Sequence, residues 1–444
     1  MLKILFLIFF ISVNMAYSDV HSFRKVFPFD YKVEGLDNGL TIIFVPMQNN
    51  GIVSYYSVVR TGSRDEYEPG HSGFAHFFEH CMFRGTKKHP GGEFDSLVTL
   101  MGASANAYTS DDLTCYHLTF AKEDLEQVIE LESDRFQNLF YQEREFQTES
   151  GAVLGEFMKS KTSPWFLIEE TMLNTAFDLH TYKHTTMGFE ADIRSMPTMY
   201  DYSRSFFNRY YRPENVVILI VGDVNAEKIL PLIKKYYGDW KKGYEQPKIE
   251  QEPEQKAERN AKVIYSGKNL PILAVAYKSP AYSPINKVDV AAGLIGDILF
   301  GQNSEIYKKL YLNEQLVQRM DYDFGQNRDP GLWSVYCEIN DEKNNDYVLN
   351  EIDHAIDNFK ISSINEEELD KLKKRLMYSF LMSLETSEHV AGALARVVSI
   401  TGGINCVDQY YNTMLSLTPK DFKEAALKYF NKSRRTVVTL RGSN

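Results

Sequence analysis

The stretch HSGFAHFFEHCMF, residues 71–83, carries histidine and glutamate side chains inside an apolar run. We expect a helix here, in which residues four apart share one face, so the imidazoles of His76 and His80 can converge on one metal ion. Glu79 precedes His80 and flanks that ion. A catalytic zinc ion takes three protein ligands and a water, and it lowers the pKa of that water towards ~7. A nearby carboxylate can then accept the proton, so His-x-x-Glu-His predicts metal-assisted hydrolysis.

A helix with its polar residues at a solvated rim is the alternative explanation for this stretch. Phe77 and Phe78 argue against it, because they bury the neighbouring positions, where each unpaired polar group would cost a few kcal/mol. His71, the remaining histidine, is expected in the turn before the helix.

A third metal ligand must come from another part of the chain. A helix is predicted from about Glu143 to Lys161, and its Glu149 and Glu156 are seven residues apart, which places them on one face. Paired glutamates on a helix are usually a solvated face. Spacing alone does not choose the ligand.

The elements that must position these residues follow from periodicity and turn signals. Strands are expected at residues 39–47, 52–63, 104–120 and 214–224, and further helices at 91–102 and 122–139. Residues 243–260, GYEQPKIEQEPEQKAERN, have no apolar periodicity and are predicted to be an exposed linker. The linker separates a domain over residues 19–242 from a second domain over residues 261–444.

The two domains are predicted to be homologous. DYSRSFFNRYYRPENVVILIVGD, from Asp201, and DFKEAALKYFNKSRRTVVTLRGS, from Asp421, each show a helix, a basic turn and a Val-Val strand. AHFFEHCMFRG, residues 75–85, can be aligned with AGLIGDILFGQ, residues 292–302, although any two α+β halves can be matched loosely by eye. We therefore expect an α+β fold of two α/β-sandwich domains, each a mostly antiparallel sheet with helices packed on it. The polar positions of the metal motif become Gly293, Gly296 and Asp297 in the second domain, which is expected to bind no metal.

Composition and the N-terminus bear on the class of protein and its location. The net charge is −11 over 444 residues, which disfavours nucleic acid or an anionic membrane as the main partner. Residues 1–18 show the layout of a secretory signal peptide, with a cut predicted before Asp19. A membrane anchor is the alternative, but the apolar run is shorter than the ~20 residues needed to span a bilayer. We expect an exported protein, periplasmic or secreted, with no membrane span after removal of the signal.

Cysteines and two further histidines are not expected to carry the chemistry. Isolated buried thiols are the favoured interpretation of the four scattered cysteines, although the sequence leaves disulfides open: Cys81, Cys115, Cys337 and Cys406. His180 and His184 have ligand-like spacing, but no acidic partner is evident in the sequence. We expect them at a loop or helix end.

Three stretches together resemble a known family. HSGFAHFFEH, NAYTSDDLTCYHLTF and ESGAVLGEF are similar to the zinc peptidases related to pitrilysin, insulin-degrading enzyme and the β-subunit of mitochondrial processing peptidase. The resemblance covers nearly the whole mature chain. It implies one Zn²⁺ per chain, held by His76, His80 and Glu156, with Glu79 as the general base and Glu149 assisting catalysis. It also implies that a strand binds the substrate backbone through Asn106, Ala107 and Thr109.

The resemblance implies an endopeptidase that cuts peptides or unfolded polypeptide segments. A non-catalytic or weakly active metal-binding subunit, acting as a scaffold or peptide-capture partner of a related chain, is the alternative. In the second domain, Tyr311 and Gln318 of YLNEQLVQ stand where the single-chain relatives carry an Arg and a Tyr that hold substrate. The chain is also half the size of those relatives. Both facts lead us to expect a second subunit, either a related chain or a second copy.

Overall fold

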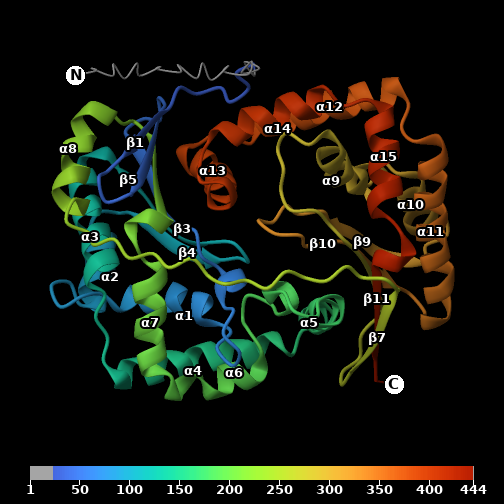
Figure 1. The fold of residues 1–444 in the computed structure, drawn as a ribbon, viewed down its shortest axis with the longest axis horizontal. Coiled ribbons are helices and arrows are strands. Elements are labelled where there is room, and N and C mark those ends of the chain that lie inside the picture. Colours follow the sequence, from blue (N-terminus) through green and yellow to red (C-terminus); the bar gives the residue numbers. More distant parts are fainter. Residues whose placement is uncertain (1–23, 444) are drawn as a thin grey trace, which may run out of the picture.

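The computed structural model describes residues 24–443, so the predicted signal peptide at residues 1–18 lies outside the described residues. The first half of the described chain builds a six-stranded sheet in the order β1-β2-β6-β3-β5-β4 (Figure 1). Only the β2–β6 pair is parallel. The strands are β1 (Lys32–Gly35), β2 (Thr41–Pro46), β3 (Ile52–Val59), β4 (Ser104–Thr109), β5 (Thr114–Ala121) and β6 (Val216–Gly222).

The second half builds a five-stranded sheet in the order β7-β11-β8-β10-β9, in which only the β7–β11 pair is parallel. Its strands are β7 (Arg259–Tyr265), β8 (Ile272–Lys278), β9 (Val317–Asp323), β10 (Leu332–Ile339) and β11 (Arg435–Gly442). The order β2-β6-β3-β5-β4 matches β7-β11-β8-β10-β9 strand for strand, including the parallel pair. The predicted fold class, two homologous α/β sandwiches with mostly antiparallel sheets, is confirmed.

The helices lie in corresponding connections between the strands in both halves. Those of the first half are α1 (Phe74–Cys81), α2 (Gly91–Leu100), α3 (Leu125–Asn138), α4 (Glu143–Ser160), α5 (Pro164–Ala176), α6 (Glu190–Ser195), α7 (Tyr200–Tyr210) and α8 (Ala226–Tyr237). Those of the second half are α9 (Lys287–Phe300), α10 (Glu305–Tyr307), α11 (Asn345–Ser362), α12 (Glu366–Met382), α13 (Ser387–Thr401), α14 (Asn405–Leu415) and α15 (Pro419–Tyr429). Helix α9 follows β8 as α1 follows β3, which is the relation predicted from the sequence.

The single strand predicted over residues 104–120 is two strands in the structure. Residues 104–120 form the hairpin β4–β5, in which the backbone N–H of Ser110 donates to the carbonyl of Leu113 over 2.8 Å. The polar pair Asp111 and Asp112 supplies the turn between the two strands.

The two halves exchange a helix. Helix α5 of the first half packs on the second sheet, where Ile168 and Met172 share a buried cluster with residues of β8 and β11. Helix α13 of the second half packs on the first sheet, where Leu394 and Val398 share a cluster with residues of β2, β3, β5 and β6 (Figure 1). Each sheet therefore depends on the other half for part of its apolar covering.

The predicted linker lies between the halves but is packed in part. It runs as the extended yellow-green segment across Figure 1 and contains no helix or strand before β7 begins at Arg259. Gln255 is 5% exposed, and the carboxylate of Glu252 accepts backbone N–H groups from residues 178–180. Lys278 Nζ lies 3.3 Å from the same carboxylate. The prediction of an exposed segment is wrong for these two side chains. Gln255 donates to the backbone carbonyl of Arg435 in the second half over 2.7 Å, and Glu252 contacts groups in both halves.

The state of the cysteines and the apolarity of the helices can also be described for residues 24–443. All four cysteines are buried and free of disulfide bonds. No single described helix is long and apolar enough to cross a membrane. By length and composition the pair α13 and α14 passes that test together, but the two helices are bent by 92° and α13 is packed on the first sheet.

Candidate functional site

Helix α1 is anchored by its apolar residues and by a buried carboxylate at its start. Phe74, Phe77 and Phe78 are fully buried in the core of the first half. Gly73 precedes the helix with φ +91°, a left-handed conformation that favours glycine. Glu66, 4% exposed, accepts the N–H of Gly73 over 2.6 Å and that of Ala75 over 2.7 Å, which satisfies donors that a helix start leaves free. The helix is thereby fixed at its N-terminal end.

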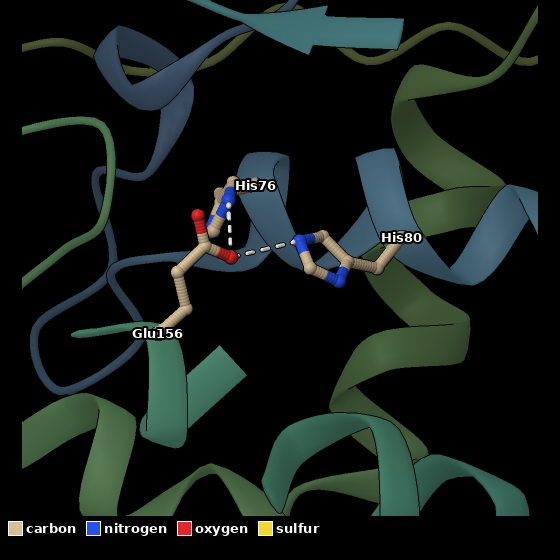
Figure 2. A group of neighbouring side chains, drawn as sticks. All are labelled: His76, His80 and Glu156. Carbon is tan, nitrogen blue, oxygen red and sulfur yellow. Dashed lines mark ion pairs between the residues drawn. The ribbon is translucent and has the colours of Figure 1, made fainter. Parts of the chain in front are cut away.

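The predicted metal ligands come together in the structure. Among the described residues, His76, His80 and Glu156 have donor atoms within 4.8 Å of one another. Oε2 of Glu156, on α4, lies 3.7 Å from Nε2 of His76 and 3.3 Å from Nε2 of His80, and Figure 2 shows this oxygen facing both rings. In a tetrahedral zinc site with bonds of ~2.0–2.1 Å, neighbouring donors lie ~3.3–3.4 Å apart. Two imidazole nitrogens and one carboxylate oxygen at these separations fit a zinc ion.

A second carboxylate contacts the other ring nitrogen of His80, and an arginine holds that carboxylate. Oε1 of Glu149 lies 3.1 Å from Nδ1 of His80, and Oε2 of Glu149 accepts from Nε of Arg84 over 2.6 Å. Burial raises the pKa of Glu149, but the hydrogen bonds from His80 and Arg84 outweigh it, so the pKa lies below its ordinary value. An ionised Glu149 bonded to Nδ1 leaves Nε2 of His80 as the metal-facing nitrogen.

The two histidines differ in their surroundings. Burial lowers the pKa of His76, which favours the neutral imidazole that a metal requires. The hydrogen bond with Glu149 raises the pKa of His80. Glu156 is the most exposed of the three groups, with 46% of its side chain accessible, so the site opens to solvent on the Glu156 side.

Glu79 faces the edge strand of the first sheet. Its Oε2 accepts a hydrogen bond from the hydroxyl of Thr109 over 2.6 Å. Thr109 is the last residue of β4, and β4 has only one neighbour in the sheet. The base predicted from the sequence is thus tied to a strand whose other edge is free among the described residues.

A groove of about 380 Å³ is lined by residues of α1 and β4. Glu79 and His80 of α1 and Asn106 and Ala107 of β4 are among its lining residues. The side-chain oxygen of Asn106 accepts the N–H of Ala107 over 2.9 Å. The predicted substrate residues therefore lie beside the predicted catalytic ones. The further lining residues are Phe83, Arg84, Asp95 and Glu149.

The remaining predicted residues contact other residues of the second half. Tyr311 stacks on Tyr307 with ring centroids 4.8 Å apart, and Gln318 on β9 donates to Asn340 over 2.8 Å. Asp297 of α9 forms an ion pair with Arg375. Among the described residues of the second half, no group of side chains with metal-ligand geometry corresponds to His76, His80 and Glu156.

His180 differs from the expectation in one respect. It lies before the short helix Thr181–Lys183, as expected for a helix-end residue. It nevertheless has an acidic partner, because its Nε2 lies 3.1 Å from Oδ2 of Asp329 in the second half. That partner is distant in sequence, so inspection of the neighbouring residues could not find it.

Comparisons with known proteins identify the family. Residues 46–190 match the family described as Insulinase (Peptidase family M16), and residues 199–376 match the Peptidase M16 inactive domain. The zinc protease PqqE of Helicobacter pylori is 31% identical over 414 residues, which cover 91% of this chain and 91% of that protein. The chain belongs to peptidase family M16, as the resemblance to the pitrilysin group predicted.

Other relatives and solved structures agree with this assignment. The mitochondrial-processing peptidase subunit beta of Rattus norvegicus is 27% identical over 382 residues, 82% of this chain and 75% of that protein. The crystal structure of a protease from Helicobacter pylori superposes with a TM-score of 0.87 at 30% identity, covering 93% of this chain and 99% of that one. The periplasmic protease PqqL from Escherichia coli has the same fold, with a TM-score of 0.76 at 20% identity. The structural match covers 93% of this chain but 48% of PqqL.

Proposed function

We propose that the chain is an exported zinc-dependent endopeptidase that hydrolyses peptides or unfolded polypeptide segments. The observation that carries the proposal is the convergence of His76, His80 and Glu156 at separations that fit a tetrahedral zinc site, with Glu79 beside them. The metal site belongs to the first domain, which we propose spans residues 19–242. The second domain, residues 261–444, contributes packing and substrate-facing surface.

The proposed chemistry divides among few residues. A zinc ion held by His76, His80 and Glu156 would lower the pKa of a water and polarise the carbonyl of the scissile peptide. Glu79 accepts the proton of the attacking water and later passes it to the leaving amine. The hydroxyl of Thr109 orients the carboxylate of Glu79 for these transfers.

The substrate is proposed to bind in extended form along β4. A strand edge offers unpaired backbone groups to which a peptide can add as a further strand. Asn106 and Ala107 line the same groove as Glu79, so a peptide on this edge would pass the catalytic groups. The N–H of Ala107, now bonded to the side chain of Asn106, is available to such a strand once that side chain moves.

Export and a second subunit form part of the same proposal. The signal-like residues 1–18 and the periplasmic location of PqqL from Escherichia coli support a periplasmic or secreted protein. The relative in Rattus norvegicus is named as a subunit, and PqqL is about twice as long as this chain. We propose that a related chain or a second copy completes the peptide-binding chamber.

The test measures metal and cleavage together. Purified protein should contain one zinc per chain by elemental analysis and should cleave casein or a quenched peptide library. A chelator should abolish cleavage, and added zinc should restore it. Bound zinc without cleavage, alone or with a related chain from the same cell, would contradict the peptidase and favour a scaffold subunit.

A further inference from the structure

The two halves meet at their corresponding hairpin turns. Strands β9 and β10 occupy the places in the second sheet that β4 and β5 occupy in the first. Residues 324–331 join β9 to β10, and residues 110–113 join β4 to β5. The backbone N–H of Arg328 donates to Oδ2 of Asp112 over 2.8 Å, which connects the two turns directly. The turn at the end of the proposed substrate strand is therefore held in part by the second half.

The guanidinium of Arg328 contacts three backbone carbonyls at once. Its Nη2 lies 3.0 Å from the carbonyl oxygen of Asp112 in the β4–β5 turn and 3.2 Å from that of Arg60, the residue after β3. The same nitrogen lies 2.9 Å from the carbonyl oxygen of Ser399 in the last turn of α13. A guanidinium is a permanently charged, rigid donor, so this one side chain joins a sheet strand, the β4–β5 turn and the exchanged helix.

The first half holds the same turn through its own backbone. The N–H of Arg64 donates to the carbonyl of Asp111 over 2.9 Å, and the hydroxyl of Ser63 donates to the carboxylate of Asp111 over 3.1 Å. Gly62 approaches the turn so closely that a Cβ there would overlap the carbonyl oxygen of Ser110. The turn therefore takes its position from both halves of the chain.

Asp329, the residue after Arg328, anchors the β9–β10 connection to the first half. Its Oδ2 accepts a hydrogen bond from Nε of Arg64 over 2.6 Å and lies 3.1 Å from Nε2 of His180. Burial raises the pKa of Asp329, but the hydrogen bonds from His180 and Arg64 outweigh burial and lower the pKa to about 2. The carboxylate is therefore ionised at neutral pH, and its ion pair with Arg64 fixes the backbone beside Arg328.

The turn is joined to the group that orients the proposed general base. Thr109, whose hydroxyl donates to Glu79, is the last residue of β4, and Ser110 begins the turn. The N–H of Ser110 donates to the carbonyl of Leu113, so strand and turn belong to one hydrogen-bonded hairpin. A displacement of the turn is therefore carried to Thr109 and to the edge of β4. Small misplacements of groups that position a substrate lower the efficiency of an enzyme strongly.

We propose that Arg328 is a positioning residue for substrate binding, which holds the β4–β5 turn so that the edge of β4 keeps the geometry an added peptide strand requires. Arg328 acts through the turn and not on the peptide or the metal. This inference rests on the proposed peptidase function and gives the second half a defined role in it.

Steady-state cleavage of a quenched casein peptide tests this role. Arg328→Gln removes the charged contact with three carbonyls and should raise KM roughly 10-fold, as for the loss of a hydrogen bond to a charged group, with a smaller effect on kcat. Arg328→Lys retains the charge and should recover part of the affinity. Zinc content should stay at one per chain in both proteins, because the metal ligands are unchanged. An unchanged KM in Arg328→Gln overturns the proposal.

Arg259→Gln is the matched control for a general loosening of the contact between the halves. Arg259 also belongs to the second half and also binds carbonyls at the end of an exchanged helix, those of Thr175 and Ala176 in α5, over 3.0 and 2.9 Å. Its side chain is 22% exposed, and that of Arg328 is 18% exposed. Its carboxylate partner is Asp178, outside the β4–β5 turn. Arg259→Gln should leave KM unchanged, and a rise as large as that in Arg328→Gln overturns the proposal.

Two measurements need no cleavage and so separate this inference from the peptidase function. Hydrogen–deuterium exchange followed by mass spectrometry should be faster over the hairpin, residues 104–121, in Arg328→Gln but not in Arg259→Gln. Fluorescence anisotropy of a fluorescein-labelled casein peptide is measured on the Glu79→Gln protein, with and without Arg328→Gln. The added change should weaken peptide binding roughly 10-fold. Absence of cleavage by the unaltered protein contradicts the peptidase alone, whereas unchanged hairpin exchange or unchanged peptide affinity overturns the role of Arg328.

Discussion

The hydroxyl of Thr109 lies 2.6 Å from Oε2 of Glu79 and so connects the edge strand β4 to the proposed general base. A peptide that adds to β4 would bind beside the residue that orients this carboxylate. Substrate placement and proton transfer are thereby coupled through a single side chain, which gives a direct prediction.

Thr109→Val should reduce kcat more than KM, because the isosteric change removes the hydroxyl donor while the strand is retained. We expect a loss of roughly 10-fold, in keeping with a hydrogen bond to a charged group of about 1.5 kcal/mol. Thr109→Ser keeps the hydroxyl and should recover most of the rate. Equal rates for the valine and serine proteins would show that the contact with Glu79 has no catalytic role.

Arg84 should matter for metal affinity through Glu149. Its guanidinium holds the carboxylate that bonds Nδ1 of His80, and loss of such supporting contacts typically lowers metal affinity 10–100-fold. Arg84→Gln is expected to weaken zinc binding roughly 10-fold in a chelator competition assay, at the low end of that range because Arg84 is partly exposed. Arg84→Lys retains the charge, so its zinc affinity should lie between those of the unaltered protein and Arg84→Gln. Identical zinc affinity in all three proteins would show that Arg84 does not support metal binding.

The helix exchange predicts that a change in the second half destabilises the first. Leu394 on α13 is 1% exposed and packs on the first sheet, so Leu394→Ala should cost about 2–5 kcal/mol of unfolding free energy. Leu427→Ala, at a position of α15 that is 54% exposed, is the matched control and should change little. Urea unfolding followed by circular dichroism measures both. Equal midpoints for the two variants would mean that α13 contributes no packing to the first sheet.

The sequence predicted much of the site because its information is local or repeated. His76, Glu79 and His80 lie within one turn and a half of helix, and their spacing alone predicts convergence. The duplicated topology was also readable, since both halves end in the same helix, turn and strand. Glu156 required the family resemblance, because Glu149 and Glu156 share a helix face and their spacing is equally suited to either role.

Other features depend on tertiary contacts that no local pattern encodes. The contact of Arg84 with Glu149 joins α4 to the turn after α1, and nothing in the residues around Arg84 indicates it. Glu66 lies before α1 in sequence, yet its role becomes visible only when its carboxylate meets the helix start. The exchange of α5 and α13 cannot be predicted from the sequence for the same reason: an amphipathic pattern shows that a helix packs on a sheet, but not on which one.

The most direct test of the central claim is the pair of measurements on Glu79→Gln, zinc content and peptide cleavage. His76, His80 and Glu156 are unchanged in this protein, so it should bind one zinc per chain as the unaltered protein does. Without a carboxylate to accept the proton of the attacking water, cleavage should fall by roughly 10²–10⁴-fold. Full zinc occupancy with undiminished cleavage would contradict the account, because Glu79 would then not be the general base.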